Sequence, residues 1–123
     1  MISLNYRDSR PIYEQIKEGF QRLILSGVLS PGDKLPSVRE LAAELAINPN
    51  TIQRAYRELE AEGFTYSIAG KGSFAAQLSE VTDTHREELL EAFDAAATEL
   101  MQLGMTEPEL SKRLHGLKKE KQQ

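Results

Sequence analysis

The chain has 123 residues, of which 40% are hydrophobic and 28% are charged, which suits one small domain with an appendage. It contains no cysteine, and this excludes a disulfide framework, a thiolate metal site and a thiol nucleophile. No apolar run approaches the roughly 20 residues that a membrane span needs, and the N-terminus lacks the pattern of a signal peptide. We therefore expect a soluble cytoplasmic protein with no membrane partner.

The formal net charge of −4 is unevenly distributed along the chain. Residues 1–76 hold nine Lys and Arg against nine Asp and Glu, whereas residues 77–123 hold six against ten. Binding of a polyanion depends on local charge, so the neutral first segment is compatible with a nucleic-acid partner. A single neutral copy would bind with modest affinity, and this favours a dimer.

A first amphipathic helix is predicted from Pro11 for about four turns, because apolar residues recur at three- and four-residue steps. These residues are Ile12, Ile16, Phe20, Leu23 and Ile24. Gly27 follows the last of them, as is common after a helix C-terminus. Residues 30–33 then carry Pro and Gly at the central positions of a type II turn.

Two shorter helices follow. Ser37 and Glu40 form the pattern of a capping box, which predicts a second helix from this point. Asn48 is a favoured N-cap and Pro49 suits a first helical position, so a third helix is expected to begin there. It should run to about Glu62. Two short helices joined by a tight turn are typical of a helix-turn-helix.

The rest of the chain predicts a hairpin and two more helices. Residues 64–68 and 73–76 have strand-like composition around a Gly-containing turn. Apolar residues with helical spacing then mark one helix over about residues 84–103 and another from about residue 106. Residues 78–83 form the expected joint between the two parts of the chain.

The expected fold is mainly α with a small β-wing. A winged helix-turn-helix DNA-binding domain would span residues 1–77, and a two-helix dimerisation tail would span residues 78–123. Within the first domain, the helix-turn-helix covers about residues 37–60 and the wing about residues 64–76.

The third helix has one apolar face and one polar face. At about 100° per residue, the apolar face is predicted to join the core. Its members are Ile52, Ala55, Tyr56 and Leu59. The opposite face carries Asn50, Arg54 and Arg57, with Gln53 at its margin. Asn and Gln pair with adenine and Arg with guanine, so this face could read a major groove. Taken alone, it could equally be an ordinary solvated face.

The order of motifs around this helix resembles the GntR family of bacterial transcription regulators. LPSVRELA at residues 35–42, NPNTIQRAYRELE at residues 48–60 and EGF at residues 62–64 carry the resemblance. PIYEQI at residues 11–16 and GDKLP at residues 32–36 belong to the same pattern. The match covers about residues 9–76, and its motifs follow in the family's order.

The resemblance implies roles for particular residues in binding double-stranded DNA. Those in the helix-turn-helix are Ser37, Arg39, Asn48, Asn50, Thr51, Gln53 and Arg54, and those in the wing are Gly70 and Lys71. For Arg39, a surface salt bridge to Glu40 or Glu44 stays open. The chain departs from the family in a wing with few basic residues and in Ala46, where related turns often carry glycine. A positive φ at Ala46 would cost about 1 kcal/mol.

The short tail resembles that of the YtrA subfamily, whose tails mediate dimerisation. Its apolar stripe exceeds what one helical hairpin can hide, so we expect burial against a second copy. The residues expected in this contact are Leu89, Phe93, Ala96, Leu100, Leu110, Leu114 and Leu117. The alternative is that the tail helices fold back on their own winged domain.

These expectations describe a repressor that binds an inverted-repeat operator as a homodimer and is relieved by an unidentified small-molecule effector. Two alternatives remain, a winged-helix protein-interaction module and an effector sensor with a pocket beside Met101 and Met105. No catalytic constellation stands out, so no enzyme activity and no cofactor are expected. His85 and His115 fit no metal-ligand spacing, so no metal site is expected.

Overall fold

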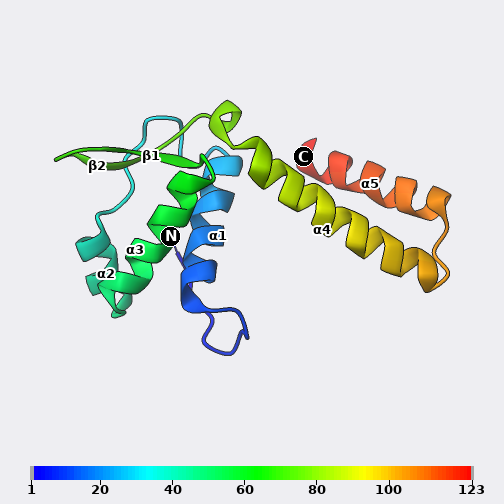
Figure 1. The fold of residues 1–123 in the computed structure, drawn as a ribbon, viewed down its shortest axis with the longest axis horizontal. Coiled ribbons are helices and arrows are strands. Elements are labelled where there is room, and N and C mark those ends of the chain that lie inside the picture. Colours follow the sequence, from blue (N-terminus) through cyan, green and yellow to red (C-terminus); the bar gives the residue numbers. More distant parts are fainter. Residues whose placement is uncertain (1, 123) are drawn as a thin grey trace. The chain divides into compact units, whose positions relative to one another are not determined.

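A computed structural model describes residues 2–122 and divides into two compact units, one ending at Asp83 and one beginning at Thr84. The first unit contains α1 (Ile12–Leu25), α2 (Val38–Leu45), α3 (Pro49–Ala61), β1 (Thr65–Ile68), β2 (Gly72–Ala75) and the 3-10 helix η1 (Leu78–Glu80). The second contains α5 (Glu107–Gln122) and nearly all of α4 (Asp83–Gln102). Figure 1 shows these elements in chain order.

The core of the first unit lies where α1 and α2 pack against α3. Its largest fully buried side chains come from α1, from α3 and from the segment before α2: Phe20, Ile16, Leu35, Ile52 and Leu59. The predicted apolar faces of α1 and α3 are therefore buried, as expected. Burial of a side chain of this size contributes about 1.5–3 kcal/mol before entropic costs, so this small core depends on each of them.

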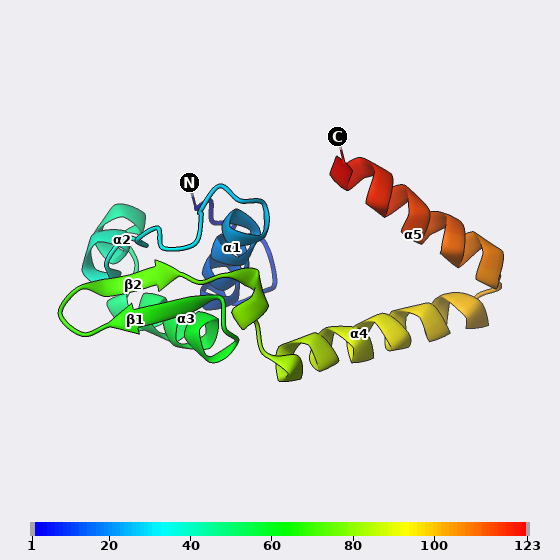
Figure 2. The ribbon, with the colours of Figure 1, turned by 90° about the horizontal axis from the view of Figure 1, so that it is seen from above.

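Strands β1 and β2 form the predicted antiparallel hairpin, which Figure 2 shows extending from the helices as a two-stranded ribbon. Its register pairs Thr65 with Ala75 and Ile68 with Gly72. A ribbon this short needs support from other elements. The Leu35 amide donates to the Ser73 carbonyl at 2.9 Å, so the segment before α2 supplies part of that support.

The N-caps of α2 and α3 are those that the sequence predicts. The Ser37 hydroxyl accepts from the Glu40 amide at 3.0 Å, and the Asn48 side chain accepts from the Asn50 amide at 2.8 Å. These contacts satisfy backbone donors that the first turn of a helix leaves without a partner. Local chemistry therefore sets where the second and third helices begin.

Ala46 ends α2 in the left-handed conformation, with φ 55° and ψ 46°. The tight turn between α2 and α3 requires this backbone, although an alanine β-carbon makes it costly. We expect Ala46→Gly to raise the free energy of unfolding by about 0.5–1 kcal/mol, because relief of strain exceeds the added entropy of the unfolded chain. Urea denaturation would show a higher midpoint with an unchanged slope. A lower midpoint would contradict this expectation.

In the second unit, α4 and α5 form a helical hairpin whose arms diverge from the turn between them (Figure 2). Thr106 begins α5 as predicted, with its hydroxyl accepting from the Glu109 amide at 3.4 Å and donating to the Glu109 carboxylate at 3.0 Å. No residue of α4 is buried. This unit therefore leaves most of its apolar side chains in contact with solvent.

Candidate DNA-binding interface

Helix α3 presents a polar face opposite its buried one. Asn50, Gln53, Arg54 and Arg57 are all exposed, and Ile52, Ala55, Tyr56 and Leu59 are all buried. The N-cap residue Asn48 is exposed and Thr51 is half-buried. The side chains that the sequence predicts to contact DNA thus share the exposed part of α3, and most of them lie in its first two turns.

The exposed face of α3 is bordered by α1 on one edge and by the wing on the other. On the first edge, the Arg54 guanidinium lies 3.7 Å from the centre of the Tyr13 ring. On the second edge, the Glu60 carboxylate accepts from the Ser67 amide of β1 at 3.0 Å. Both edges of the candidate reading face are therefore fixed by contacts to other elements.

A polar network joins α1 to the α3 edge. The Lys17 ammonium contacts carboxylate oxygens of Glu58 and Glu62, each at 3.0 Å, and the Gln21 amide donates to Glu62 at 2.9 Å. Burial disfavours the charged form of Lys17, but these carboxylates outweigh it and raise its pKa. Burial likewise opposes ionisation of Glu58, yet Lys17 and Arg54 lower its pKa overall. Lys17 and Glu58 are therefore charged near neutral pH.

Tyr56 links α3 to the segment that enters α2. Its ring packs edge-on against Phe20 with centroids 5.6 Å apart, and its hydroxyl donates to the Pro36 carbonyl at 2.6 Å. Burial is the main reason that the pKa of this phenol is raised. Helix α3 and the segment that enters α2 are thus joined by a side-chain hydrogen bond in addition to apolar packing.

We expect Tyr56→Phe to lower the free energy of unfolding by about 1 kcal/mol, because the ring stays and only the hydrogen bond to Pro36 is lost. Chemical denaturation of both proteins under the same conditions measures the difference. Phe20→Leu serves as a comparison, since it alters the packing against the Tyr56 ring and leaves the hydroxyl in place. An unchanged midpoint in Tyr56→Phe would show that this bond does not stabilise the domain.

In α2, the cap residue Ser37 and its neighbour Arg39 are both exposed. The structure records no salt bridge from Arg39 to Glu40 or Glu44, all three of which lie in the described part of the chain. The structure therefore does not contain the alternative considered for Arg39, a surface salt bridge to Glu40 or Glu44.

The wing places Gly70 and Lys71 in the exposed turn between β1 and β2. Tyr66 and Phe74 stack across the two strands with ring centroids 5.6 Å apart, which stiffens the ribbon. Lys34 was not among the DNA-binding residues predicted from the sequence. Its backbone forms an isolated antiparallel β-bridge with Phe74, and its Cε would lie 3.2 Å from a β-carbon added to Gly72. The wing thus has a second lysine beside it.

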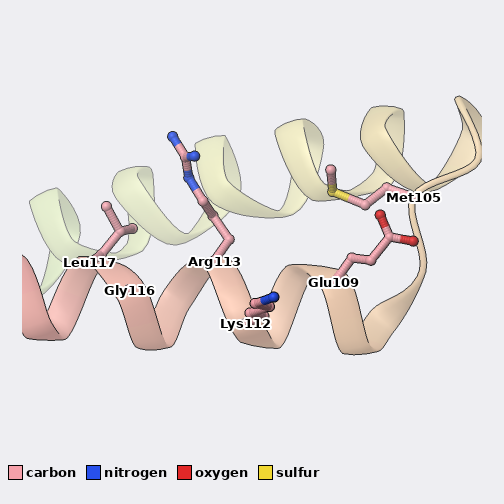
Figure 3. Close-up of a pocket in the computed structure, with 6 residues that line it drawn as sticks. All are labelled: Met105, Glu109, Lys112, Arg113, Gly116 and Leu117. Atoms are coloured by element: carbon pink, nitrogen blue, oxygen red, sulfur yellow. The ribbon is translucent and has the colours of Figure 1, made fainter.

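The residues predicted for dimerisation lie in the second unit and are largely exposed. Leu89, Phe93, Leu100, Leu114 and Leu117 are 58%, 49%, 40%, 49% and 51% exposed, Ala96 is exposed and Leu110 is half-buried. A pocket of about 490 Å³ lies on this hairpin. Figure 3 shows its lining residues, with Met105 in the turn and the others on α5. Those residues are Glu109, Lys112, Arg113, Gly116 and Leu117.

Within residues 2–122, no group of three or more metal-ligating side chains comes together, and no helix has the length and apolar character to cross a membrane. The candidate interface offers hydrogen bonding and charge on one exposed helix face beside a two-stranded wing.

This arrangement of helix-turn-helix, bordered third helix and wing defines a winged helix-turn-helix protein of the DNA-binding class. The sequence pattern of the family described as "Bacterial regulatory proteins, gntR family" matches residues 12–74, about half of the chain. The chain belongs to the GntR family of bacterial transcription regulators, as its motifs predict.

Two relatives come from Bacillus subtilis (strain 168). The HTH-type transcriptional repressor YtrA is 48% identical over 82 residues, which cover 67% of this chain and 63% of that protein, slightly under two thirds of its length. The uncharacterized HTH-type transcriptional regulator YhcF is 41% identical over 115 residues, 92% of each chain. The chain is thus similar to YtrA-like members of the family.

Solved structures support the fold. A protein described as a transcriptional antiterminator from Listeria monocytogenes EGD-e has a TM-score of 0.82 and 30% identity, with coverage of 98% of this chain and 92% of that one. The DNA-binding domain of AraR in complex with an operator has a TM-score of 0.53 and 32% identity, with coverage of 60% and 89%. The winged helix-turn-helix fold, mainly α with a small β-wing, is confirmed.

Proposed function

We propose that the chain is a repressor that binds a palindromic operator as a homodimer, with α3 in the major groove and the wing beside it. The observation that carries this proposal is the exposed face of α3, where the side chains of Asn50 and Arg57 have no salt bridge or hydrogen bond in the described part of the chain. Side chains of these types hydrogen-bond to base edges. The relative seen on an operator, AraR, supports the same use of the fold.

The tail supports the homodimer. Helices α4 and α5 expose large apolar side chains, including Phe93 and Leu117, and their arms diverge (Figure 2). A second copy that packs its own hairpin into this opening would remove these side chains from water. Two heads related by a twofold axis then meet half-sites about one helical turn apart, or a multiple of that.

Two further parts of the proposal concern regulation and place of action. A small-molecule effector would relieve repression by binding the tail and changing the angle between the heads, and the pocket around Arg113 offers it polar and apolar contacts (Figure 3). The protein would act as a regulator without enzyme activity, in the bacterial cytoplasm and on the nucleoid when bound.

The test is selection of duplexes from a random library, with sequencing of the bound fraction. We expect the wild-type chain to enrich an inverted repeat and Arg39→Ala/Asn50→Ala to enrich none while it remains folded by circular dichroism. The charge control is Arg22→Ala, which removes an exposed arginine from the last turn of α1. This variant should enrich the same repeat. Failure of folded wild-type protein to enrich any sequence at low salt would favour the protein-interaction alternative.

A separate measurement tests the dimer. Sedimentation of the wild-type chain should give the mass of two copies, and Phe93→Asp/Leu117→Asp should give the mass of one, because both side chains are about half exposed in a single copy. The matched control is Glu91→Asp, which changes an exposed α4 residue without changing its charge. A monomeric wild-type protein would overturn the assignment of the tail.

A further inference from the structure

Arg54 is held on the α1 side of α3 by three contacts. Its guanidinium lies over the Tyr13 ring, 3.7 Å from the centroid, its Nη2 donates to the Tyr13 hydroxyl at 3.1 Å, and its Nε donates to Glu58 at 3.3 Å. The side chain is nevertheless 55% exposed. Arginine has five N–H donors, so donors remain free for another anion. Arg54 is thus anchored and still accessible.

The position of Arg54 on the helix separates it from the base-reading face. Arg54 and Glu58 are four residues apart and share the edge that meets α1, whereas Gln53 shares the opposite edge with Glu60, which meets the wing. Asn50 and Arg57 lie between these edges. A helix about 10–12 Å across nearly fills a major groove about 12 Å wide. Side chains on its edges therefore face the phosphate walls, and those between them face the bases.

We propose that Arg54 binds a backbone phosphate rather than a base, that Tyr13 is its positioning residue, and that Glu58 weakens DNA binding by competing for the same guanidinium. The inference deepens the proposed function and rests on the chain binding duplex DNA. Contacts to phosphate fix the register of a protein on the duplex but carry no sequence information. Arg54 therefore adds affinity for every sequence.

Tyr13 supplies a rigid support on a different helix. Its hydroxyl accepts from Arg54 and lies 3.3 Å from the Glu14 carboxylate, while the ring face meets the guanidinium plane. An arginine restrained in this way loses less rotational freedom when it binds a phosphate. Tyr13 would therefore act through Arg54, and removing it should have no effect once Arg54 is gone.

Glu58 has a second partner, which makes a matched control available. Lys17 contacts Glu58 and Glu62 at equal distances of 3.0 Å, whereas Arg54 contacts Glu58 and not Glu62 among the recorded salt bridges of the described residues. Glu58→Gln removes the carboxylate that competes with phosphate. Glu62→Gln removes the same charge one turn away and leaves the Arg54–Glu58 pair intact.

The experiment measures fluorescence anisotropy of the full chain with two probes over a series of salt concentrations. One probe is a pool of random duplexes of about 30 base pairs, or three helical turns, and the other is the inverted repeat enriched by wild-type protein. Arg54→Gln should weaken binding to both probes by the same factor, on the order of tenfold, and lower the salt slope by about one for each protomer. Arg22→Gln should leave both probes unaffected.

The Tyr13 variants test positioning. Tyr13→Leu should weaken binding to both probes but add nothing in the Arg54→Gln background, and Tyr13→Phe should fall between Tyr13→Leu and wild type because it keeps the ring. Glu58→Gln should tighten binding to both probes more than Glu62→Gln does. Circular dichroism confirms that each variant is folded.

Several outcomes would overturn the assignment. If Arg54→Gln weakens the inverted repeat and spares the random pool, then Arg54 reads a base. If the Tyr13 and Arg54 effects simply add, Tyr13 does not act through Arg54. If Glu58→Gln and Glu62→Gln behave alike, competition at Arg54 plays no part. Wild-type protein that binds neither probe at low salt would instead refute the proposed function, and the inference with it.

Discussion

Gly63→Ala is expected to lower the free energy of unfolding by about 3 kcal/mol or more. Gly63 has φ +86°, where an L side chain is strained by about 1–2 kcal/mol. A β-carbon there would also lie 2.0 Å from the Glu80 carbonyl oxygen and 2.9 Å from the Val81 Cα. Both neighbours are backbone atoms, so no rotamer change can relieve the overlap.

A β-carbon on Gly63 would displace residues 80–82, which are hydrogen-bonded to the end of α3. The Thr82 amide donates to the Glu62 carbonyl at 3.0 Å, next to Gly63. Moving residues 80–82 away from the end of α3 would break this bond, which adds about 0.5–1.5 kcal/mol to the cost. Urea denaturation followed by circular dichroism measures the total.

Gly27→Ala is the matched control, because Gly27 has nearly the same dihedral, φ +83°, and nothing lies within 4 Å of its added β-carbon. It should show the conformational cost alone, about 1–2 kcal/mol. Equal losses at Gly63 and Gly27 would mean that the segment at Glu80 moves aside freely and that its contact with α3 contributes little.

Asn50→Ala/Arg57→Ala is expected to abolish selectivity for the operator while leaving non-specific DNA binding in place. Each specific base contact contributes about 1–3 kcal/mol of discrimination, and a homodimer would use each side chain in two half-sites. The loss for each residue is therefore about 2–6 kcal/mol, or roughly 30-fold to 10⁴-fold in affinity for the operator. The readout is the ratio of affinities for the enriched inverted repeat and the random pool.

Stability should not account for this result, because both side chains are exposed and lie outside the core. The Asn50 backbone amide, which donates to the Asn48 side chain, is unchanged by the substitution. A thermal-denaturation midpoint close to that of wild type serves as the control. An unaltered affinity ratio would show that α3 does not read the bases through these residues.

The local features of the fold could be read directly from the sequence. Ser37 and Asn48 cap the helices that they were predicted to cap, and the apolar spacing in α1 and α3 identifies the buried face of each. Such features depend on residues within about one helical turn, so a pattern contains them. The strain at Ala46 was also expected from the tight turn.

The features that the sequence does not predict depend on contacts between residues far apart in the chain. Tyr13 meets Arg54 across 41 positions, and Lys34 reaches the wing from the loop before α2. Nothing in the local composition around Tyr13 marks it as a partner of α3, although its four-residue spacing from Lys17 shows that both share one face of α1. The 3-10 helix η1 was likewise expected only as a joint.

Domain limits also depend on such contacts. The sequence places the boundary after residue 77, whereas the compact units of the structure divide after Asp83. Residues 78–82 lie with the first unit because Gly63 and Glu62 at the end of α3 contact them directly.

The attachment of Thr82 to the end of α3 has a consequence for the choice of operator. Since α4 begins at Asp83, no residue intervenes between the anchored Thr82 and the tail helix, so any hinge is confined to the dihedrals at this junction. So short a hinge has few backbone dihedrals with which to compensate for altered half-site geometry. One inserted base pair turns a half-site by about 35° around the duplex axis. As the proposed homodimer on an inverted repeat, the protein should therefore tolerate base changes between the half-sites far better than changes in the number of base pairs that separate them.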